Sequence, residues 1–418
     1  MTTDRKPKLF YGYIVVLTAF LIMMVTWGAF YCFGVFFKPV LVEFGWTRAA
    51  TSGAYSLSFV LSGFIGIFAG RLSDRLGPRI VVIGCGLFLG SGYLLMSQIS
   101  IIWQLYLFYG VIVGIGLSGV YVSAVSAVSR WFVKRRGMMT GIVIAGIGAG
   151  TMIMPPLANW FISSYGWRAS YNIIGIIVLV LMILAAQFLK RDPSQIGLSP
   201  YGENEVEQES LNLEARGFSL QRAIHTGQFW MLCVMFLCFG VSVQAIIVHI
   251  VIHATELEIS AASAANILAV IGGVSITGRI IMGSAGDRIG NKLAITICFI
   301  LMSVALLWLL ATKELWMFYL FAVIFGFAYG GWAALMSLIV AELFGLSSLG
   351  VILGAVIFSV TIGEAIGPAL AGGIFDITSS YQPAFLVCAG LSIITIILVL
   401  FLRPITNKGG ENDSERST

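Results

Sequence analysis

Long apolar stretches separated by short polar loops make up most of the 418 residues of the chain. A helix needs about 20 mostly apolar residues to cross the hydrocarbon core of a bilayer. By that measure the sequence predicts twelve membrane-spanning helices. The first six are predicted at 10–37, 51–70, 80–98, 101–129, 138–163 and 169–189, and the second six at 228–256, 260–286, 293–311, 315–341, 349–373 and 383–402.

One long polar stretch, from Lys190 to Thr226, interrupts this pattern and is rich in glutamate, serine and proline. It separates the predicted helices into two groups of six. The predicted fold is therefore an all-α membrane protein in which two pseudo-symmetric six-helix halves surround a central cavity. The predicted organisation is a first half at 1–189, a cytoplasmic linker at 190–226, a second half at 227–403 and a polar cytoplasmic tail at 404–418.

The composition excludes most soluble proteins, because hydrophobic residues make up 59% of the chain and charged residues only 10%, against roughly 25% charged residues in soluble domains. The six cysteines all lie in apolar runs without the C-x-x-C spacing of a metal or redox site. The sequence also has no nucleophile–base constellation and no phosphate-binding loop. We therefore expect no catalytic site, no metal and no cofactor, and hence no enzyme.

The basic residues predict the orientation in the membrane, since cytoplasmic loops carry an excess of Lys and Arg. With the N-terminus inside, 19 of them fall on inside segments and 4 on outside segments, and Arg279 completes the total of 24. Both termini and the linker are therefore predicted to be cytoplasmic. A multi-pass protein of the plasma membrane is expected, in a bacterium the inner membrane. The net charge of +5 is dispersed, so no nucleic-acid partner is expected.

The loops at 70–79 and 283–292 share the ten-residue pattern G-x-x-x-D-R-x-G-x-[RK], at a spacing of 213 residues. Each follows the second helix of its group, which predicts two homologous halves. The second glycine of each copy would permit a tight turn, and each aspartate could accept hydrogen bonds that exist in only one global state. We predict a conformational latch formed by Gly70, Asp74, Arg75, Gly77, Arg79, Gly283, Asp287, Arg288 and Gly290.

The two loops resemble the signature of the major facilitator superfamily. In addition, residues 131–146 look like the [Y/W]-F-x-K-R-R-x-x-A-x-G-x-x-x-A-G stretch of the monocarboxylate porters, with Met139 at the position of the first alanine. Bacterial oxalate–formate exchangers belong to the same broad group. The resemblance implies a transporter of small organic anions.

Arg279 is the only basic residue inside a predicted span, and ionisable residues in the bilayer core are candidates for function. A guanidinium can bind a carboxylate through two parallel hydrogen bonds. The resemblance also implies an arginine at this place in the eighth span. The alternative is a structural arginine that pairs with an acid on another helix.

Four further residues are predicted to contact the substrate. Ser275 lies one turn before Arg279, and the amphipathic rings of Tyr31, Tyr121 and Tyr329 suit a short organic anion. The alternative for each tyrosine is ordinary packing. Many animal monocarboxylate porters have an aspartate at the position of Ser275 and a lysine in the first span, and both are missing here.

Three residues are candidates for proton coupling. Glu364 is the only acid deep inside a predicted span, and burial disfavours its charged form. Alternatively, it hydrogen-bonds a helix break near Pro368. Glu256 ends the seventh span, where it could approach Arg279, and His249 lies in the same span, although a membrane histidine is more often an ordinary hydrogen-bonding residue.

The sequence thus predicts a secondary active transporter of small monocarboxylates, of the lactate or pyruvate type, with proton symport by alternating access. An organic-anion exchanger of the oxalate–formate type is an alternative, although the single buried cation favours a monoanion. A membrane substrate sensor is the alternative from another class. The expected partners are the carboxylate, a proton and the lipid bilayer, and the chain is expected to function as a monomer.

Overall fold

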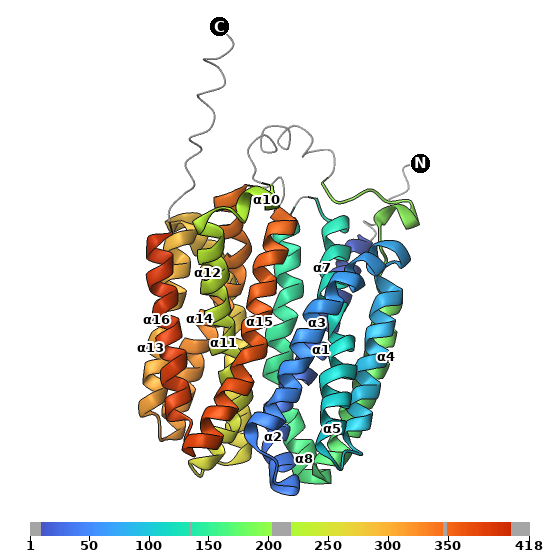
Figure 1. Cartoon of the computed structure of the whole chain (residues 1–418). Helices are drawn as coiled ribbons and strands as arrows, with labels where there is room; N and C mark the ends of the chain where they lie inside the picture. Colours follow the sequence, from blue (N-terminus) through green and yellow to red (C-terminus); the bar gives the residue numbers. More distant parts are fainter. Residues whose placement is uncertain (1–9, 134, 203–218, 346–348, 403–418) are drawn as a thin grey trace.

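The computed structural model describes residues 10–133, 135–202, 219–345 and 349–402. Within these ranges the chain is almost entirely helical, and the one bridge of β type joins Phe132 to Tyr201. Figure 1 shows the long helices side by side in a single bundle. This is the arrangement expected in lipid, where each backbone polar group needs a partner within its own helix.

The first half contains six spans. Only the second and third of them are single separate helices. The first span is α1 followed by α2, and the fourth is assembled from four consecutive segments, one of them π-helical. The elements are α1 (Tyr11–Tyr31), α2 (Phe33–Phe44), α3 (Arg48–Leu76), α4 (Pro78–Met96), α5 (Ile102–Leu105), η1 (Tyr106–Val113), α6 (Gly114–Ser118), α7 (Val120–Trp131) and α8 (Arg136–Phe188).

Helix α8 contains two consecutive spans, the fifth and the sixth. Gly166 has φ 78° and ψ 160°, a conformation outside the helical region, and it marks the point at which the two helices join. The described chain has eleven helical stretches that are long and apolar enough to cross a membrane, and α8 supplies one of them. Because Gly166 divides α8, the prediction of twelve spans is confirmed.

The second half has regular spans that follow the linker. The described linker contains two short elements, and each later span is a single helix. These elements are η2 (Pro193–Ile196), α10 (Leu220–Ala223), α11 (Gly227–Glu256), α12 (Ala261–Ile289), α13 (Asn291–Ala311), α14 (Leu315–Phe344), α15 (Leu349–Thr378) and α16 (Gln382–Phe401).

The repeated loop has the same backbone geometry in both halves. Gly77 separates α3 from α4 with φ 89° and ψ 155°, and Gly290 separates α12 from α13 with φ 87° and ψ 143°. A side chain would be strained at this φ. The one-residue turn therefore explains why both copies need glycine at this position.

The last residue of each repeated loop ties its half together. Arg79, at the start of α4, donates to the side chain of Gln187 at the end of α8. Lys292, at the start of α13, donates through Nζ to the carbonyls of Leu400 at 3.0 Å and Leu402 at 2.7 Å. The basic residue thus joins the third span to the end of the sixth in both halves, and Lys292 satisfies carbonyls that a helix end leaves free.

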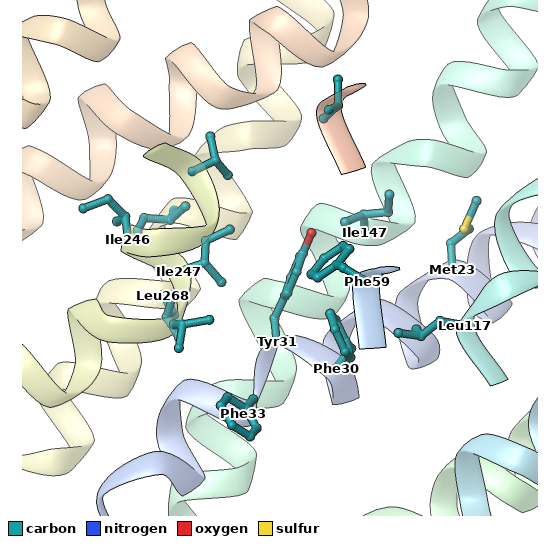
Figure 2. Close-up of a cluster of buried hydrophobic side chains, with 14 of the residues drawn as sticks. Met23, Phe30, Tyr31, Phe33, Phe59, Leu117, Ile147, Ile246, Ile247 and Leu268 are labelled. Atoms are coloured by element: carbon teal, nitrogen blue, oxygen red, sulfur yellow. The ribbon is translucent and has the colours of Figure 1, made fainter. Parts of the chain in front are cut away.

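The two halves meet along three pairs of helices: α8 with α12, α3 with α15, and α2 with α11. Figure 1 shows α3 and α15 next to each other where the halves join. Figure 2 shows Tyr31 and Ile147 of the first half with Ile246, Ile247 and Leu268 of the second in one apolar cluster. The hydrophobic core therefore continues from one half into the other.

Two faces of the bundle are distinguished below. The linker face is the end at which α1 begins, α8 ends, α11 begins and α16 ends, at the top of Figure 1. The far face is the opposite end, at which α3 and α12 begin and α11 and α15 end.

Small residues allow the helices of the second half to pack closely, and this generates a stability prediction. A Cβ added to Gly330 of α14 would overlap the backbone of Ser275 of α12, whereas no atom lies within 4 Å of a Cβ added to Gly354 of α15. We expect Gly330→Ala to lower the apparent melting temperature of the detergent-solubilised protein by about 5 °C, because overpacking outweighs the gain in helix propensity. Gly354→Ala is the control and should leave it unchanged or slightly raised. Equal melting temperatures for the two variants would contradict this packing.

Candidate functional site

Arg279 lies deep in the bundle at the contact between the two halves. It is 18 residues beyond Ala261, the first residue of α12, which places it about 27 Å from the far face along the helix. Its side chain is buried, and Nη1 donates to the carbonyl of Ile144 of α8 at 3.2 Å. Its Nε atom is also buried and has no hydrogen-bond partner among the described residues. The guanidinium therefore retains unused donor capacity.

Tyrosine hydroxyls are the electrostatic neighbours of this guanidinium. Tyr329 of α14, Tyr31 of α1 and Tyr121 of α7 all interact with Arg279, and the centre of the Tyr329 ring lies 5.9 Å from Cζ. The hydroxyls of Tyr31 and Tyr329 are 3.5 Å apart across the two halves. The structure thus brings the three predicted tyrosines together around Arg279. Within the described chain, no carboxylate forms an ion pair with it.

Ser275 lies one turn from Arg279 on α12 but faces the neighbouring helices. It is fully buried, and its hydroxyl donates to the carbonyl of Gly272 at 2.7 Å in the same helix. It packs beside Gly148 of α8 and Gly330 of α14. In this arrangement its hydroxyl is engaged by its own helix, and contact with a substrate stays a prediction.

Glu364 of α15 interacts with the same tyrosine pair. It is partly buried and interacts electrostatically with both Tyr31 and Tyr329. Its Cγ lies against Gly240 of α11, and the side chain of Gln244, one turn further along α11, interacts with its carboxylate. Arg279 and Glu364 thus both interact with the hydroxyls of Tyr31 and Tyr329.

Glu256 lies at the far face and pairs with Arg48 of α3. The expected approach of Glu256 to Arg279 is not found, because Glu256 ends α11 at the far face and Arg279 lies about 27 Å deeper. Arg48 also donates to the Tyr381 hydroxyl at 2.6 Å, and its Cζ is 3.4 Å from the centre of the Phe375 ring. Arg48 therefore joins the first half to the second.

Asp376 strengthens the same junction. Its two carboxylate oxygens accept hydrogen bonds from the backbone amides of Arg48 at 2.9 Å and Ala49 at 2.8 Å. An acidic group is stabilising at a helix N-terminus, where backbone amides lack partners. Here the helix belongs to the first half and the acid to the second. We call Arg48, Glu256, Asp376 and Tyr381 the far-face gate.

His249 is fully buried just beneath this gate. One ring nitrogen, Nδ1, is 2.9 Å from the Tyr381 hydroxyl, and the other, Nε2, is 2.9 Å from the carbonyl oxygen of Pro368. The same carbonyl accepts a hydrogen bond from Ser52 of α3 at 3.0 Å. Both nitrogens of His249 are thus occupied where the halves meet, and its part in proton coupling stays a prediction.

Comparison with known proteins agrees with this geometry. The model of the Major Facilitator Superfamily matches residues 19–283 and 230–418. The chain belongs to the Major Facilitator Superfamily. Membership identifies it as a transporter and not an enzyme, and the family predicted from the loop motifs is confirmed.

Proteins named for monocarboxylate transport are among the relatives of this transporter. Monocarboxylate transporter 12 of Rattus norvegicus is 28% identical, over 94% of this chain and 85% of its own. Monocarboxylate transporter 13 of Bos taurus is 26% identical over 90% and 86%. The uncharacterized MFS-type transporter YhjX of Escherichia coli is 28% identical over 76% of each chain.

The fold matches a solved transporter over nearly its full length. A bacterial homolog of the human lysosomal transporter Spinster, in an inward-facing and unoccupied conformation, has a TM-score of 0.68 at 18% identity. The match covers 96% of this chain and 95% of that one. At this identity the likeness shows the fold, and it confirms the predicted all-α class.

The predicted latch lies at the linker face of the transporter. Arg75 and Arg288 are exposed there, beside the two glycine turns. Gly70 lies against Val122, and Gly283 lies near Ala334. The side chains of Asp74 and Asp287 fall outside the described part of the structure, so the latch stays a prediction.

The stretch that resembles monocarboxylate porters holds the start of the linker. Trp131 is fully buried and donates through Nε1 to the carbonyl of Lys190 at 3.0 Å. Backbone hydrogen bonds join Tyr201 to Trp131 and to Val133. Lys134, linker residues 203–218 and the tail at 404–418 lie outside the described ranges. The described beginning of the linker is therefore attached to the first half.

The far-face gate generates a prediction about opening. Substituting Arg48→Gln removes the charge that binds Glu256, Tyr381 and Phe375, so we expect the far ends of the two halves to separate more often. Spin labels on Val42→Cys and Ile377→Cys, both highly exposed at the far face, can measure this by pulsed electron paramagnetic resonance. The substitution should add a population at longer distance.

Arg168→Gln provides the matched control for that measurement. Arg168 binds Glu43 at 2.6 Å on the same face, and both belong to the first half, so its loss should leave the distance distribution unchanged. The six native cysteines are buried, which favours selective labelling of the introduced ones. A distribution that Arg48→Gln does not alter would exclude the gate.

Proposed function

We propose that this transporter carries small monocarboxylates, of the lactate or pyruvate type, together with a proton. The observation that carries the proposal is the buried guanidinium of Arg279, whose electrostatic neighbours are tyrosines and not carboxylates. A buried charge is costly unless it is paired. A substrate carboxylate would supply the missing negative charge, and the names of the relatives support this class of substrate.

The surrounding tyrosines suit a small substrate that touches both halves. Tyr31 and Tyr121 belong to the first half, and Tyr329 and Arg279 to the second. Their hydroxyls can donate to the carboxylate or to a hydroxyl or carbonyl group beside it. Arg279 is the only basic residue in the middle of a described span, and a single cation favours a monoanion over a dianion such as oxalate.

Glu364 is the proton carrier that the geometry favours. In the proposed cycle the positive charge of Arg279, which interacts with the same two tyrosines as Glu364, would favour the ionised carboxylate while no anion is bound. A bound anion would offset that positive charge, so Glu364 would take up a proton more readily. By reciprocity, proton uptake at Glu364 would tighten anion binding. One proton per monoanion makes the transport electroneutral.

Alternating access follows from the two rigid halves around this site. The far-face gate would hold one entrance closed while the substrate exchanges through the linker face. The latch residues of the two repeated loops would control the rate of this cycle at the linker face. We place that face in the cytoplasm and the protein in the plasma membrane, the inner membrane in a bacterium, and we propose that it works as a monomer.

The first test of this proposal concerns Arg279. In proteoliposomes, Arg279→Lys should reduce L-lactate uptake about tenfold or more, because an ammonium cannot form the two parallel hydrogen bonds of a guanidinium. Arg168→Lys, at the far face, makes the same chemical change away from the site and should keep normal uptake. Normal lactate uptake by Arg279→Lys would sink the proposal.

The second test concerns the proton. Wild-type uptake of L-lactate should rise as the external pH falls, since protonation of Glu364 favours anion binding. Glu364→Gln mimics the protonated form, so it should lose accumulation driven by a pH gradient and retain lactate–lactate exchange. Glu256→Gln and His249→Gln should keep the pH dependence. If either of those two variants loses it and Glu364→Gln does not, the carrier lies beneath or within the far-face gate.

A further inference from the structure

A side-chain hydrogen bond crosses between the halves beside the proposed proton carrier. Tyr55 of α3 donates through its hydroxyl to Oε1 of Gln244 on α11, at 3.1 Å, and both side chains are fully buried. The Tyr55 ring is stacked on Phe30, with ring centres 4.5 Å apart and planes 18° apart. The first half therefore holds the donor in a fixed position against the second.

The other end of the Gln244 amide is directed by this bond. A glutamine amide has one acceptor end and one donor end, so fixing Oε1 also fixes Nε2. The Nε2 atom is buried and has no hydrogen-bond partner among the described residues, and the side chain interacts electrostatically with the carboxylate of Glu364. Gly240, one turn earlier on α11, lets Glu364 approach closely because it has no side chain.

We propose that Gln244 is a positioning residue that links the charge of Glu364 to the contact between the halves. The inference rests on the proposed role of Glu364. While the far face is closed, Tyr55 holds Oε1, so Nε2 stabilises the ionised carboxylate of Glu364. When α3 moves away from α11, the amide is released and Glu364 takes up a proton more easily. Glu364 thus loses its proton in the far-face-closed state and gains it in the open state.

The other groups that face Glu364 do not provide such a link. Tyr31 from α1, Tyr55 from α3 and Tyr329 from α14 interact with it electrostatically. Arg279 of α12 is the nearby cation and shares Tyr31 and Tyr329 with it. Gln244 differs from these groups, because its amide interacts with the carboxylate and also accepts a hydrogen bond from the opposite half.

Infrared spectroscopy can test this on the purified full-length protein without any substrate. The protonated carboxyl band that disappears in Glu364→Gln reports the protonation of Glu364, and its intensity is followed against pH. Gln244→Leu should move the midpoint to higher pH by about one unit, since the ionised form loses the attraction of the nearby amide N–H group. Tyr55→Phe should move it in the same direction by less. The double variant should move it no further than Gln244→Leu alone, because Tyr55 acts through Gln244.

Ser242→Ala is the matched control. Ser242 is fully buried two residues away on α11 and donates to the carbonyl of Cys388 at 3.2 Å, so its loss removes a buried hydrogen bond without touching Glu364. The midpoint should stay at the wild-type value. If Gln244→Leu does not fold, Tyr55→Phe still decides the question.

Three results would overturn the inference: an unchanged midpoint in both variants, a shift to lower pH, or the absence of any band that depends on Glu364. A shift shared by Ser242→Ala would also overturn it. The titration is independent of transport. Absent lactate uptake would therefore count against the proposed function, whereas an unmoved midpoint would count against the role of Gln244.

Discussion

An unpaired positive charge in the middle of a membrane bundle is costly, and Arg279 has such a charge. Its guanidinium is buried, one nitrogen donates to the carbonyl of Ile144 across the halves, and another has no partner among the described residues. Tyrosine hydroxyls reduce the cost without neutralising the charge. Under the proposed function, the carboxylate of the substrate would supply the negative charge that these hydroxyls do not, so the same buried cation would also provide selectivity for an anion.

The basic residues that end the two repeated loops hold the helices of each half together, as the proposed alternating access requires. Arg79 and Lys292 join the third span to the sixth within each half, and the glycine turns before them fix the second span against the third. The contacts between the halves depend on separate helix pairs. Each half can therefore move as a unit, and the polar contacts that change are those made across the halves.

The sequence predicted the features that depend on local chemistry. Length and hydropathy are sufficient to count the spans, and a lone arginine in an apolar helix is conspicuous. The glycines of the repeated loops were predicted for the same reason, since their positive φ is a property of a single residue. Tyr121 and Tyr329 were predicted because they lie in the middle of glycine-rich spans, and Tyr31 because of its amphipathic ring; the structure brings all three near Arg279.

Features that depend on which helices pack together could not be predicted in this way. Arg48 and Asp376 are ordinary loop charges in the sequence, and only the contact of α3 with α15 pairs them. Gln244 carries no charge and lies in an apolar run, so nothing marks it until α11 lies beside Glu364. The suggested approach of Glu256 to Arg279 is not found in this structure, because Glu256 ends α11 at the far face and Arg279 lies about 27 Å from that face.

In the proposed cycle, the free energy of the contacts in the far-face gate has to be comparable to the free energy that ligand binding provides. The Arg48–Glu256 pair is partly exposed, with side-chain exposures of 16% and 29%, and exposed ion pairs contribute about 0–1 kcal/mol. The amide bonds to Asp376 resemble a helix cap, which contributes about 0.5–2 kcal/mol. A ligand of millimolar affinity gains about 4 kcal/mol on binding. A ligand shifts a conformational equilibrium only by its difference in affinity for the two states. In the proposed site Tyr31 and Tyr121 come from one half and Arg279 from the other, so the affinity for an anion would differ between the two states, and this difference can be no larger than the total binding free energy.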